Sequence, residues 1–309
     1  MKSLVGYTGF VGSNIAAQGN FDKLYNSKNI SEAFGTKPEL LIYSGVRAEM
    51  YLANNFPEKD FEQINEAFEN IKKIQPENVV LISTISVYGE NPTGDEDTVI
   101  DESNLTVYGK NRLWLEKKVQ EQFPNHLIIR LPALYGKNIK KNFIYDYIHI
   151  IPPMLKKEKF EELLKKNAEL SDFYFLQENG FYKCRELTNK EKETLIIFFK
   201  NAGFSALNFT DSRSKYQFYN LSMLYEHIQK ALNAGINKLN ITTEPIQISE
   251  LYNYLEKESF VNILSKSPFN YNLHSKYAEL FDGKNGYMFD KKFVMKDIAC
   301  FINKQKKEV

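Results

Sequence analysis

Short runs of apolar residues alternate with amphipathic segments along the first 140 residues. The apolar runs lie at 3–5, 40–43, 79–83 and 127–131. They alternate little between apolar and polar positions, which is typical of strands covered on both faces. Between them, 60–74 repeats apolar residues at helical spacing, and 106–123 has a similar apolar face. This order predicts an α/β fold with a doubly wound parallel sheet.

The start of the helix at 60–74 is inferred from two polar residues. Asp60 and Gln63 have the spacing of a capping box, in which each side chain accepts or returns a hydrogen bond at a helix N-terminus. We therefore expect the helix to begin at Asp60.

Composition narrows the class of protein. The chain has 309 residues, of which 43% are hydrophobic, and its 40 basic and 39 acidic residues leave a formal charge of +1. A folded globular protein is expected, with no global field for nucleic acid or a membrane surface. Cys184 and Cys300 form no CxxC pair, so neither a disulfide framework nor a metal site is expected. No apolar run of about 20 residues and no signal peptide is evident, which predicts a cytoplasmic protein.

A glycine-rich turn follows the first apolar run. Gly6, Gly9 and Gly12 recur at intervals of three before a helical segment. A tight turn, close backbone approach to a pyrophosphate and close helix packing each favour a residue without a Cβ. The helix N-terminus would offer N–H groups to the phosphates, so this turn predicts a dinucleotide site.

Hydroxyl side chains lie where the later strands end. Thr84 closes the third apolar run, and Tyr108 opens the helix that follows. Because open α/β sheets bind ligands at the carboxyl ends of their strands, both side chains are expected in one cleft.

Four motifs together resemble the extended short-chain dehydrogenase/reductase superfamily, in its nucleotide-sugar epimerase, dehydratase and reductase branch. They are GYTGFVG at 6–12, LISTISVYG at 81–89, YGKNR at 108–112 and IIRLPALYG at 128–136. The resemblance implies a Rossmann core at 1–145 and a largely substrate-binding region at 146–309, of which about 205–245 returns to the core. An atypical helical insertion is expected near 151–205, as a substrate lid, a homodimer surface or a surface insertion with its own small core.

The resemblance also assigns catalytic roles. The family's tyrosine falls on Tyr108, its hydroxyl residue on Thr84, and its lysine on Arg112, which gives an atypical YxxxR. Tyr108 would exchange a proton with a sugar oxygen that Thr84 also binds. Arg112 would keep the lysine's electrostatic role, because it lies one helical turn from Tyr108.

The resemblance further implies NADP or NAD as cofactor. Its binding residues would be the glycine turn, Tyr108, Arg112 and six others: Phe10, Val11, Ser27, Lys28, Ser44 and Gly45. Ser27 and Lys28 follow a predicted strand near 23–26 where no carboxylate stands for both ribose hydroxyls, so NADP is as plausible as NAD. Lys28 as a solvated surface residue is the alternative.

The substrate implied by the resemblance is a nucleotide-diphosphate sugar. Thr84 and Tyr88 would contact it, Ala133 stands where the family often has an asparagine, and Arg213 or Lys215 would bind the pyrophosphate. The region between the first two apolar runs is short, as in dTDP-4-dehydrorhamnose reductases. A ketoreductase or an epimerase, with a role in polysaccharide biosynthesis, is therefore expected. A non-catalytic nucleotide-binding sensor or scaffold of the same fold is the alternative.

Overall fold

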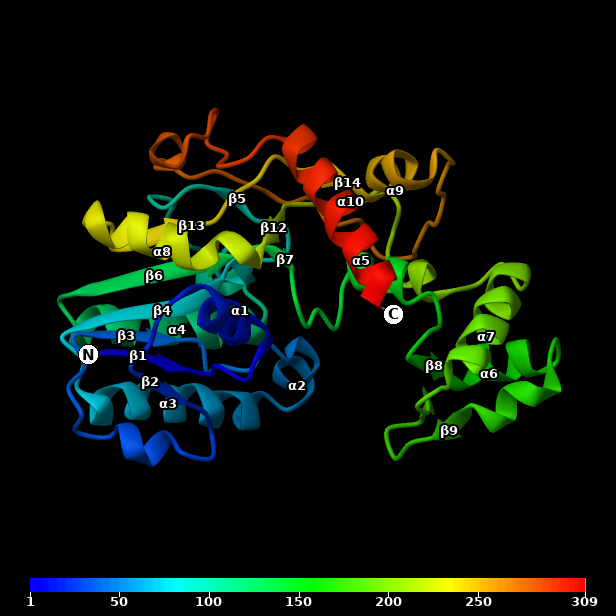
Figure 1. The fold of residues 1–309 in the computed structure, drawn as a ribbon, viewed down its shortest axis with the longest axis horizontal. Coiled ribbons are helices and arrows are strands. Elements are labelled where there is room, and N and C mark those ends of the chain that lie inside the picture. The colour runs from blue at the N-terminus through cyan, green and yellow to red at the C-terminus, as the bar shows by residue number, and fades with distance from the viewer. Residues whose placement is uncertain (309) are drawn as a thin grey trace.

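A sheet of six parallel strands forms the centre of the molecule in the computed structural model, which describes residues 1–308 (Figure 1). In spatial order the strands are β13 (Lys238–Asn240), β6 (His126–Leu131), β4 (Asn78–Thr84), β3 (Leu40–Tyr43), β1 (Lys2–Val5) and β2 (Lys23–Tyr25). Each neighbouring pair is parallel. The predicted α/β fold is confirmed, and the four apolar runs coincide with β1, β3, β4 and β6.

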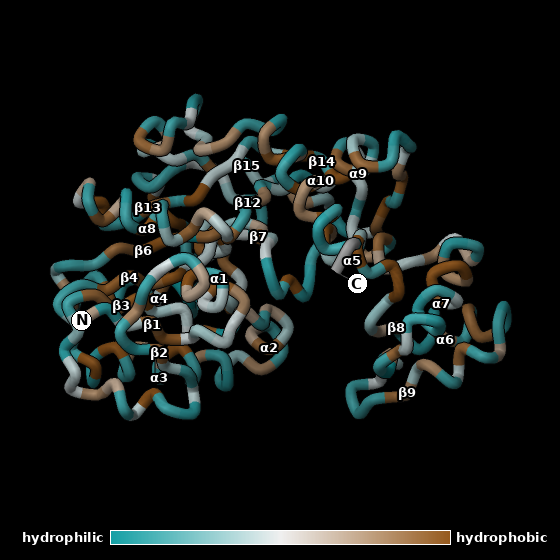
Figure 2. The backbone as a smooth tube through the Cα atoms, viewed as in Figure 1, coloured by the Kyte–Doolittle hydropathy of each residue, from teal (hydrophilic) through white to brown (hydrophobic). Residues whose placement is uncertain are grey.

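Helices cover both faces of this sheet. On one face, α1 (Phe10–Gln18) and α8 (Leu224–Asn233) pack their buried residues against the strands. On the other face, α3 (Pro57–Ile74) and α4 (Val107–Gln122) do the same. Figure 2 shows hydrophobic residues along the strands and hydrophilic residues on the outer loops. Burial on both faces explains why the strands lack an alternating pattern.

The strand order reverses between β1 and β3. From β1 the chain passes outward to β2, then crosses to β3 and continues through β4 and β6 on the other side. Because the strands are parallel, their carboxyl ends share one edge of the sheet. This edge is the position at which open α/β folds bind ligands.

The start of α3 differs from its prediction. The helix begins at Pro57, with Phe56 at the N-cap, so Asp60 lies inside the first turn and does not cap it. Proline is favoured at the first helical position because it lacks an N–H that would have no partner there. The capping-box interpretation was therefore wrong, and the Asp60 carboxylate is free for another contact.

A second part of the chain packs beside the strand edge. It contains β5 (Thr93–Gly94), β7 (Ala133–Tyr135), α5 (Phe143–Ile148), β11 (Lys215–Tyr216), β12 (Phe218–Asn220), β14 (Ile246–Gln247), α9 (Ile248–Glu256), β15 (Asn272–Leu273) and α10 (Lys291–Glu308), whereas α2 (Met50–Asn55) packs against α3 and α4 of the core. Buried residues of β7, α5, α9 and α10 form a core of their own. The Tyr135 hydroxyl donates to Asp297 at 2.6 Å, which fastens α10 to β7.

Residues 151–205 form a separate small unit to the right in Figure 1. It consists of β8 (Met154–Lys156), α6 (Lys157–Leu164), β9 (Tyr174–Leu176), β10 (Phe181–Cys184) and α7 (Asn189–Asn201). Its strands form an antiparallel sheet in the order β8-β10-β9, and its buried apolar side chains form a distinct cluster. The hairpin of β9 and β10 lies between the two helices in the chain.

Within residues 1–308, no helix combines the length and apolar composition needed to cross a bilayer. Over the same residues, no group of three or more His, Cys, Asp or Glu side chains is arranged to hold a metal ion.

Candidate active site

The glycine-rich turn joins β1 to α1 at the carboxyl edge of the sheet. Gly6 has a φ of +89°, and a Cβ there would lie 2.6 Å from the Ser44 carbonyl oxygen. A Cβ on Gly12 would lie 2.1 Å from the Gly6 carbonyl oxygen. Both positions therefore require glycine for backbone reasons alone.

Gly9 differs from its two neighbours. Its φ is −79°, its nearest contact to an added Cβ would be 3.3 Å away, and it is exposed. It forms the N-cap of α1 without a side-chain hydrogen bond, so the first N–H groups of the helix, beginning at Phe10 and Val11, have no side-chain cap. This end of α1 suits an anion.

The structure brings the segment after β3 against this turn. The Ser44 backbone N–H and hydroxyl both donate to the Val5 carbonyl, at 3.0 and 2.8 Å. A Cβ on Gly45 would meet the Val5 side chain at 3.1 Å. Ser44 and Gly45 thus lie beside the glycine-rich turn.

Ser27 and Lys28 lie exposed in the turn that follows β2. Two asparagines brace this turn, because Asn29 accepts from the Asn26 N–H at 2.8 Å and Asn26 accepts from the Lys28 N–H at 2.9 Å. A hydroxyl and an ammonium are therefore presented to solvent next to β2.

Thr84 and Tyr108 meet where β4 ends and α4 begins. Thr84 caps a short 3-10 helix at Ile85–Tyr88 by accepting from the Ser86 N–H at 3.2 Å, and its hydroxyl hydrogen-bonds Tyr108. Gly109 makes the approach of α4 possible, since a Cβ there would lie 2.4 Å from the Ser86 carbonyl oxygen. Thr84 and Tyr108 thus lie together at the carboxyl edge of the sheet.

The Tyr108 phenol is buried, with 6% of its surface exposed. Burial raises its pKa above the usual 10.0, because a phenolate loses solvation there. The Arg112 charge opposes this effect, the Asp60 charge adds to it, and hydrogen bonds from Arg112 and Thr84 lower the pKa. The net direction is upward, so Tyr108 is a protonated phenol at neutral pH.

Arg112 lies against the Tyr108 ring, with its guanidinium carbon 3.8 Å from the ring centroid. It forms a buried ion pair with Asp60 and donates to the Arg47 carbonyl at 2.7 Å. Its Nε is buried and has no hydrogen-bond partner among the described residues 1–308. The guanidinium thus connects α4, α3 and the segment after β3.

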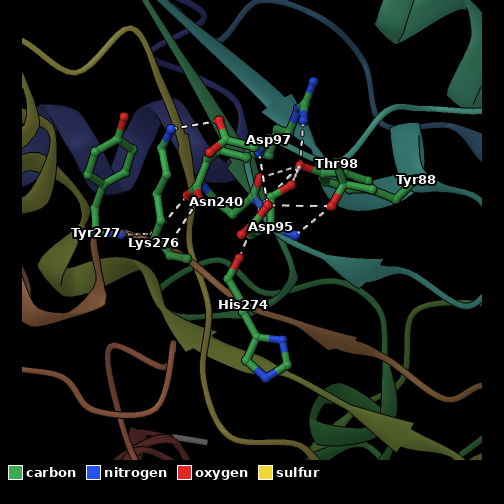
Figure 3. Close-up of polar contacts among 11 residues, drawn as sticks. Tyr88, Asp95, Asp97, Thr98, Asn240, His274, Lys276 and Tyr277 are labelled. Atoms are coloured by element: carbon green, nitrogen blue, oxygen red, sulfur yellow. Dashed lines mark hydrogen bonds and ion pairs between the residues drawn. The ribbon is translucent and has the colours of Figure 1, made fainter.

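Tyr88 belongs to a polar network that includes Asp95 and Asn240 (Figure 3). Its hydroxyl accepts from Arg130 at 2.6 Å and donates to the Asp95 carbonyl at 2.8 Å. The Asn240 amide donates to it at 3.0 Å, and Arg130 is paired with the buried Glu116. The Tyr88 hydroxyl therefore holds the 89–98 loop against β13 and β6, and contact with substrate stays a prediction.

Ala133 is half-buried in β7, which pairs in parallel with β12. Its backbone N–H donates to the Gln217 carbonyl at 3.1 Å. A methyl group at this position has no hydrogen-bonding capacity, so any polar contact with a ligand here would come from the backbone.

Arg213 has an intramolecular partner. Its guanidinium donates twice to Asp211, at 3.0 and 2.7 Å, and Asp211 also accepts from the Leu264 N–H at 2.9 Å. The Arg213 side chain is 45% exposed, and Lys215 lies exposed in β11. Both cations face solvent beside the 258–270 segment, which the Asp211 carboxylate anchors.

Sequence reasoning missed two residues at this site. Asp60 was interpreted as a helix cap, and its pairing with Arg112 on α4 was missed because no spacing rule connects residues so far apart in the sequence. Gly109 carried a signal, since a glycine in the first turn of a helix is unfavourable unless another backbone approaches closely.

Comparison with known proteins adds evidence on the fold. No protein-family model and no curated protein matches the sequence. Among solved structures, RMD from Pseudomonas aeruginosa complexed with NADPH aligns over 100% of this chain and 99% of its own, at a TM-score of 0.63 and 13% identity. dTDP-4-dehydrorhamnose reductase from Bacillus anthracis in complex with NADP aligns over 98% of this chain and 97% of its own, at a TM-score of 0.62 and 15% identity.

An epimerase aligns with a similar TM-score. UDP-N-acetylglucosamine 4-epimerase from Methanobrevibacter ruminantium, in complex with UDP-N-acetylmuramic acid, aligns over 100% of this chain and 98% of its own, at a TM-score of 0.60 and 12% identity. At such low identity the alignments establish the architecture. The chain has the fold of these reductases and epimerases.

Proposed function

We propose that the protein is an NADP-dependent ketoreductase that acts on a nucleotide-activated keto sugar. The observation that carries this proposal is the buried Tyr108 phenol, hydrogen-bonded to Thr84 and stacked with a guanidinium, at the sheet edge that also holds the glycine-rich turn. The structural neighbours that are nucleotide-sugar reductases support the same reaction class.

The residues at the first turn fit a dinucleotide. Gly6 and Gly12 keep the backbone compact, and Gly9 leaves the uncapped start of α1 accessible to a pyrophosphate. Ser27 and Lys28 would contact a 2′-phosphate, and residues 26–29 include no carboxylate to repel one. This favours NADP over NAD, as do the neighbours solved with NADPH and NADP.

Tyr108 supplies the proton in this proposal. A reduced nicotinamide, when bound, would supply a hydride to the keto carbon. Tyr108 would transfer its phenolic proton to the keto oxygen, so that the ketone becomes a secondary alcohol, and a water molecule would then return a proton to Tyr108. Thr84 would hydrogen-bond the same oxygen.

We place reductase ahead of epimerase because the segment between β1 and β3 is short, as in dTDP-4-dehydrorhamnose reductases. Tyr108 can serve as the proton donor of a reduction, because a phenol whose pKa lies above the usual 10.0 is protonated at neutral pH.

Arg213 and Lys215 are proposed to bind the substrate pyrophosphate. Both are exposed, and two phosphate charges call for cations. Arg213 would have to share its guanidinium with Asp211. Lys215 has no ion pair within the described residues, so its ammonium would be the more available of the two cations.

The test is oxidation of NADPH, followed by absorbance, with a panel of dTDP-, UDP- and GDP-linked 4-keto sugars. Wild-type protein should oxidise NADPH with at least one of them, and Tyr108→Phe should abolish turnover while retaining NADPH binding. Tyr254→Phe is a matched control, because Tyr254 is an exposed tyrosine on α9 with no proposed role in binding or reaction.

A non-catalytic nucleotide-binding protein is the second candidate. The observation that favours it is the engagement of Arg112 by Asp60 and the Arg47 carbonyl, which restricts the guanidinium from reaching a ribose. This candidate predicts NADPH binding in calorimetry without oxidation on any sugar of the panel.

A further inference from the structure

Asp60 is a buried carboxylate that lies near Tyr108 through its ion pair with Arg112. Only 2% of its surface is exposed, and its carboxylate accepts from the Arg112 guanidinium and, at 2.8 Å, from the Asn111 amide. A buried carboxylate carries a desolvation penalty that its partners must offset. The pairing therefore fixes where the Arg112 side chain can lie.

The geometry of Arg112 follows from its two anchors. Asp60 holds one terminal nitrogen from α3, and the Arg47 carbonyl holds the other from the segment after β3. Between these anchors the guanidinium lies 3.8 Å from the Tyr108 ring centroid. If Asp60 lost its charge, the Arg47 carbonyl would still hold the guanidinium beside the phenol.

We propose that Asp60 is a positioning residue, which holds Arg112 against Tyr108 and neutralises its charge, so that Tyr108 remains a proton donor. The catalytic purpose of this arrangement rests on the proposed reduction, in which Tyr108 donates a proton. An unpaired cation beside the phenol would favour the phenolate, whereas an ion pair largely cancels that influence.

The charges around Tyr108 agree with this role. Asp60 raises the pKa of Tyr108 and Arg112 lowers it, while burial is the largest influence. Two further charged groups lie in the same region: Lys141, which interacts electrostatically with Arg112 and donates to the Ala48 carbonyl, and Glu49, which acts on Lys141. Neither is among the groups that shift Tyr108, so Asp60 is the carboxylate to test.

The decisive measurement is the pKa of Tyr108 itself. Protein labelled with ¹³Cζ-tyrosine is titrated by NMR, and the Tyr108 signal is identified by its loss in Tyr108→Phe. Asp60→Asn should lower the Tyr108 pKa by about 1 or more, because the cation then acts unopposed. Asp60→Glu should restore the wild-type value. Glu58→Gln, an exposed carboxylate on the same helix, is the matched control and should change nothing.

A second variant guards against misfolding of Asp60→Asn. Arg112→Gln removes the cation and should raise the Tyr108 pKa, and the double variant Asp60→Asn/Arg112→Gln should lie between the single variants. An unchanged or raised pKa in folded Asp60→Asn overturns the proposal, as does a fall in Arg112→Gln.

The reaction provides a separate readout. If the protein reduces a keto sugar, Asp60→Asn should move the alkaline limit of kcat to lower pH by the same amount as the NMR titration. Absence of turnover in wild-type protein would refute the proposed reduction, while the NMR result alone would still decide whether Asp60 controls Tyr108.

Discussion

Substitution of Gly12 and Gly9 by alanine should separate the folding role of the glycine-rich turn from its binding role. In Gly12→Ala the new Cβ would lie 2.1 Å from the Gly6 carbonyl oxygen and 2.6 Å from its carbon, whereas ordinary contact begins near 3.4 Å. The Gly6 carbonyl accepts from the Gly9 N–H at 2.9 Å, so this turn must shift by about 1 Å. We expect a loss of about 3 kcal/mol in the free energy of unfolding.

Gly9→Ala should behave differently. Its added Cβ would lie 3.3 Å from the nearest atom, and its φ of −79° and ψ of 170° suit any residue. The free energy of unfolding should therefore change by less than about 1 kcal/mol. The methyl group would occupy the space in front of the α1 N-terminus, so NADPH affinity should fall about tenfold or more. The larger Gly9→Val should lose more affinity with the fold intact.

Urea denaturation measures the first effect and calorimetry with NADPH the second. Trp114, the only tryptophan, packs edge-on against Phe61 and Phe68 and reports unfolding by fluorescence. Equal destabilisation of Gly12→Ala and Gly9→Ala would refute the argument from the close contact. Unchanged NADPH affinity in folded Gly9→Ala would refute the assignment of a pyrophosphate site.

Three further predictions concern other parts of the chain. Burial lowers the pKa of His227 from 6.5 to about 4, so the neutral imidazole contributes to stability above pH 6.5, and about 3 kcal/mol of the free energy of unfolding is lost as pH falls through 4. Urea titrations of His227→Gln at a series of pH values should lack this loss. The same pH dependence in the variant and the wild type would contradict the prediction. Replacement of Arg213 and Lys215 together by Ala should weaken nucleotide-sugar binding in calorimetry without affecting NADPH; equal loss of both ligands would argue against the pyrophosphate role. Arg112→Ala should lower the free energy of unfolding by about 3 kcal/mol or more, measured in urea, because buried Asp60 loses its ion pair. Arg112→Lys should keep part of the stability, the turnover and the cofactor affinity. An unaltered urea midpoint in Arg112→Ala would show that the ion pair contributes little to stability.

The sequence predicted the sheet because its signals are local. The apolar runs of β1, β3, β4 and β6 are continuous, and the glycine-rich turn stands directly after the first, so periodicity and turn chemistry suffice. The meeting of Thr84 and Tyr108 also followed from the shared edge of parallel strands.

The remaining features depend on contacts between distant segments. Asp60 meets Arg112 across 52 residues, and a spacing rule of three residues selected the wrong partner for it. The strands β8, β9 and β10 are three or four residues long, and they form only because each pairs with another. Tyr88 matched a motif, but its three hydrogen-bond partners come from three separate segments.

The two ends of the small unit at 151–205 lie next to each other. The Ala206 N–H donates to the Ile150 carbonyl at 2.9 Å, and the unit has an apolar core of its own. A segment with adjoining ends can be exchanged without stretching the host, since its removal leaves only a short gap to close. This makes the junction a grafting site: a fluorescent protein, whose ends also lie close together, could replace the unit and turn the molecule into an optical reporter of its own ligand.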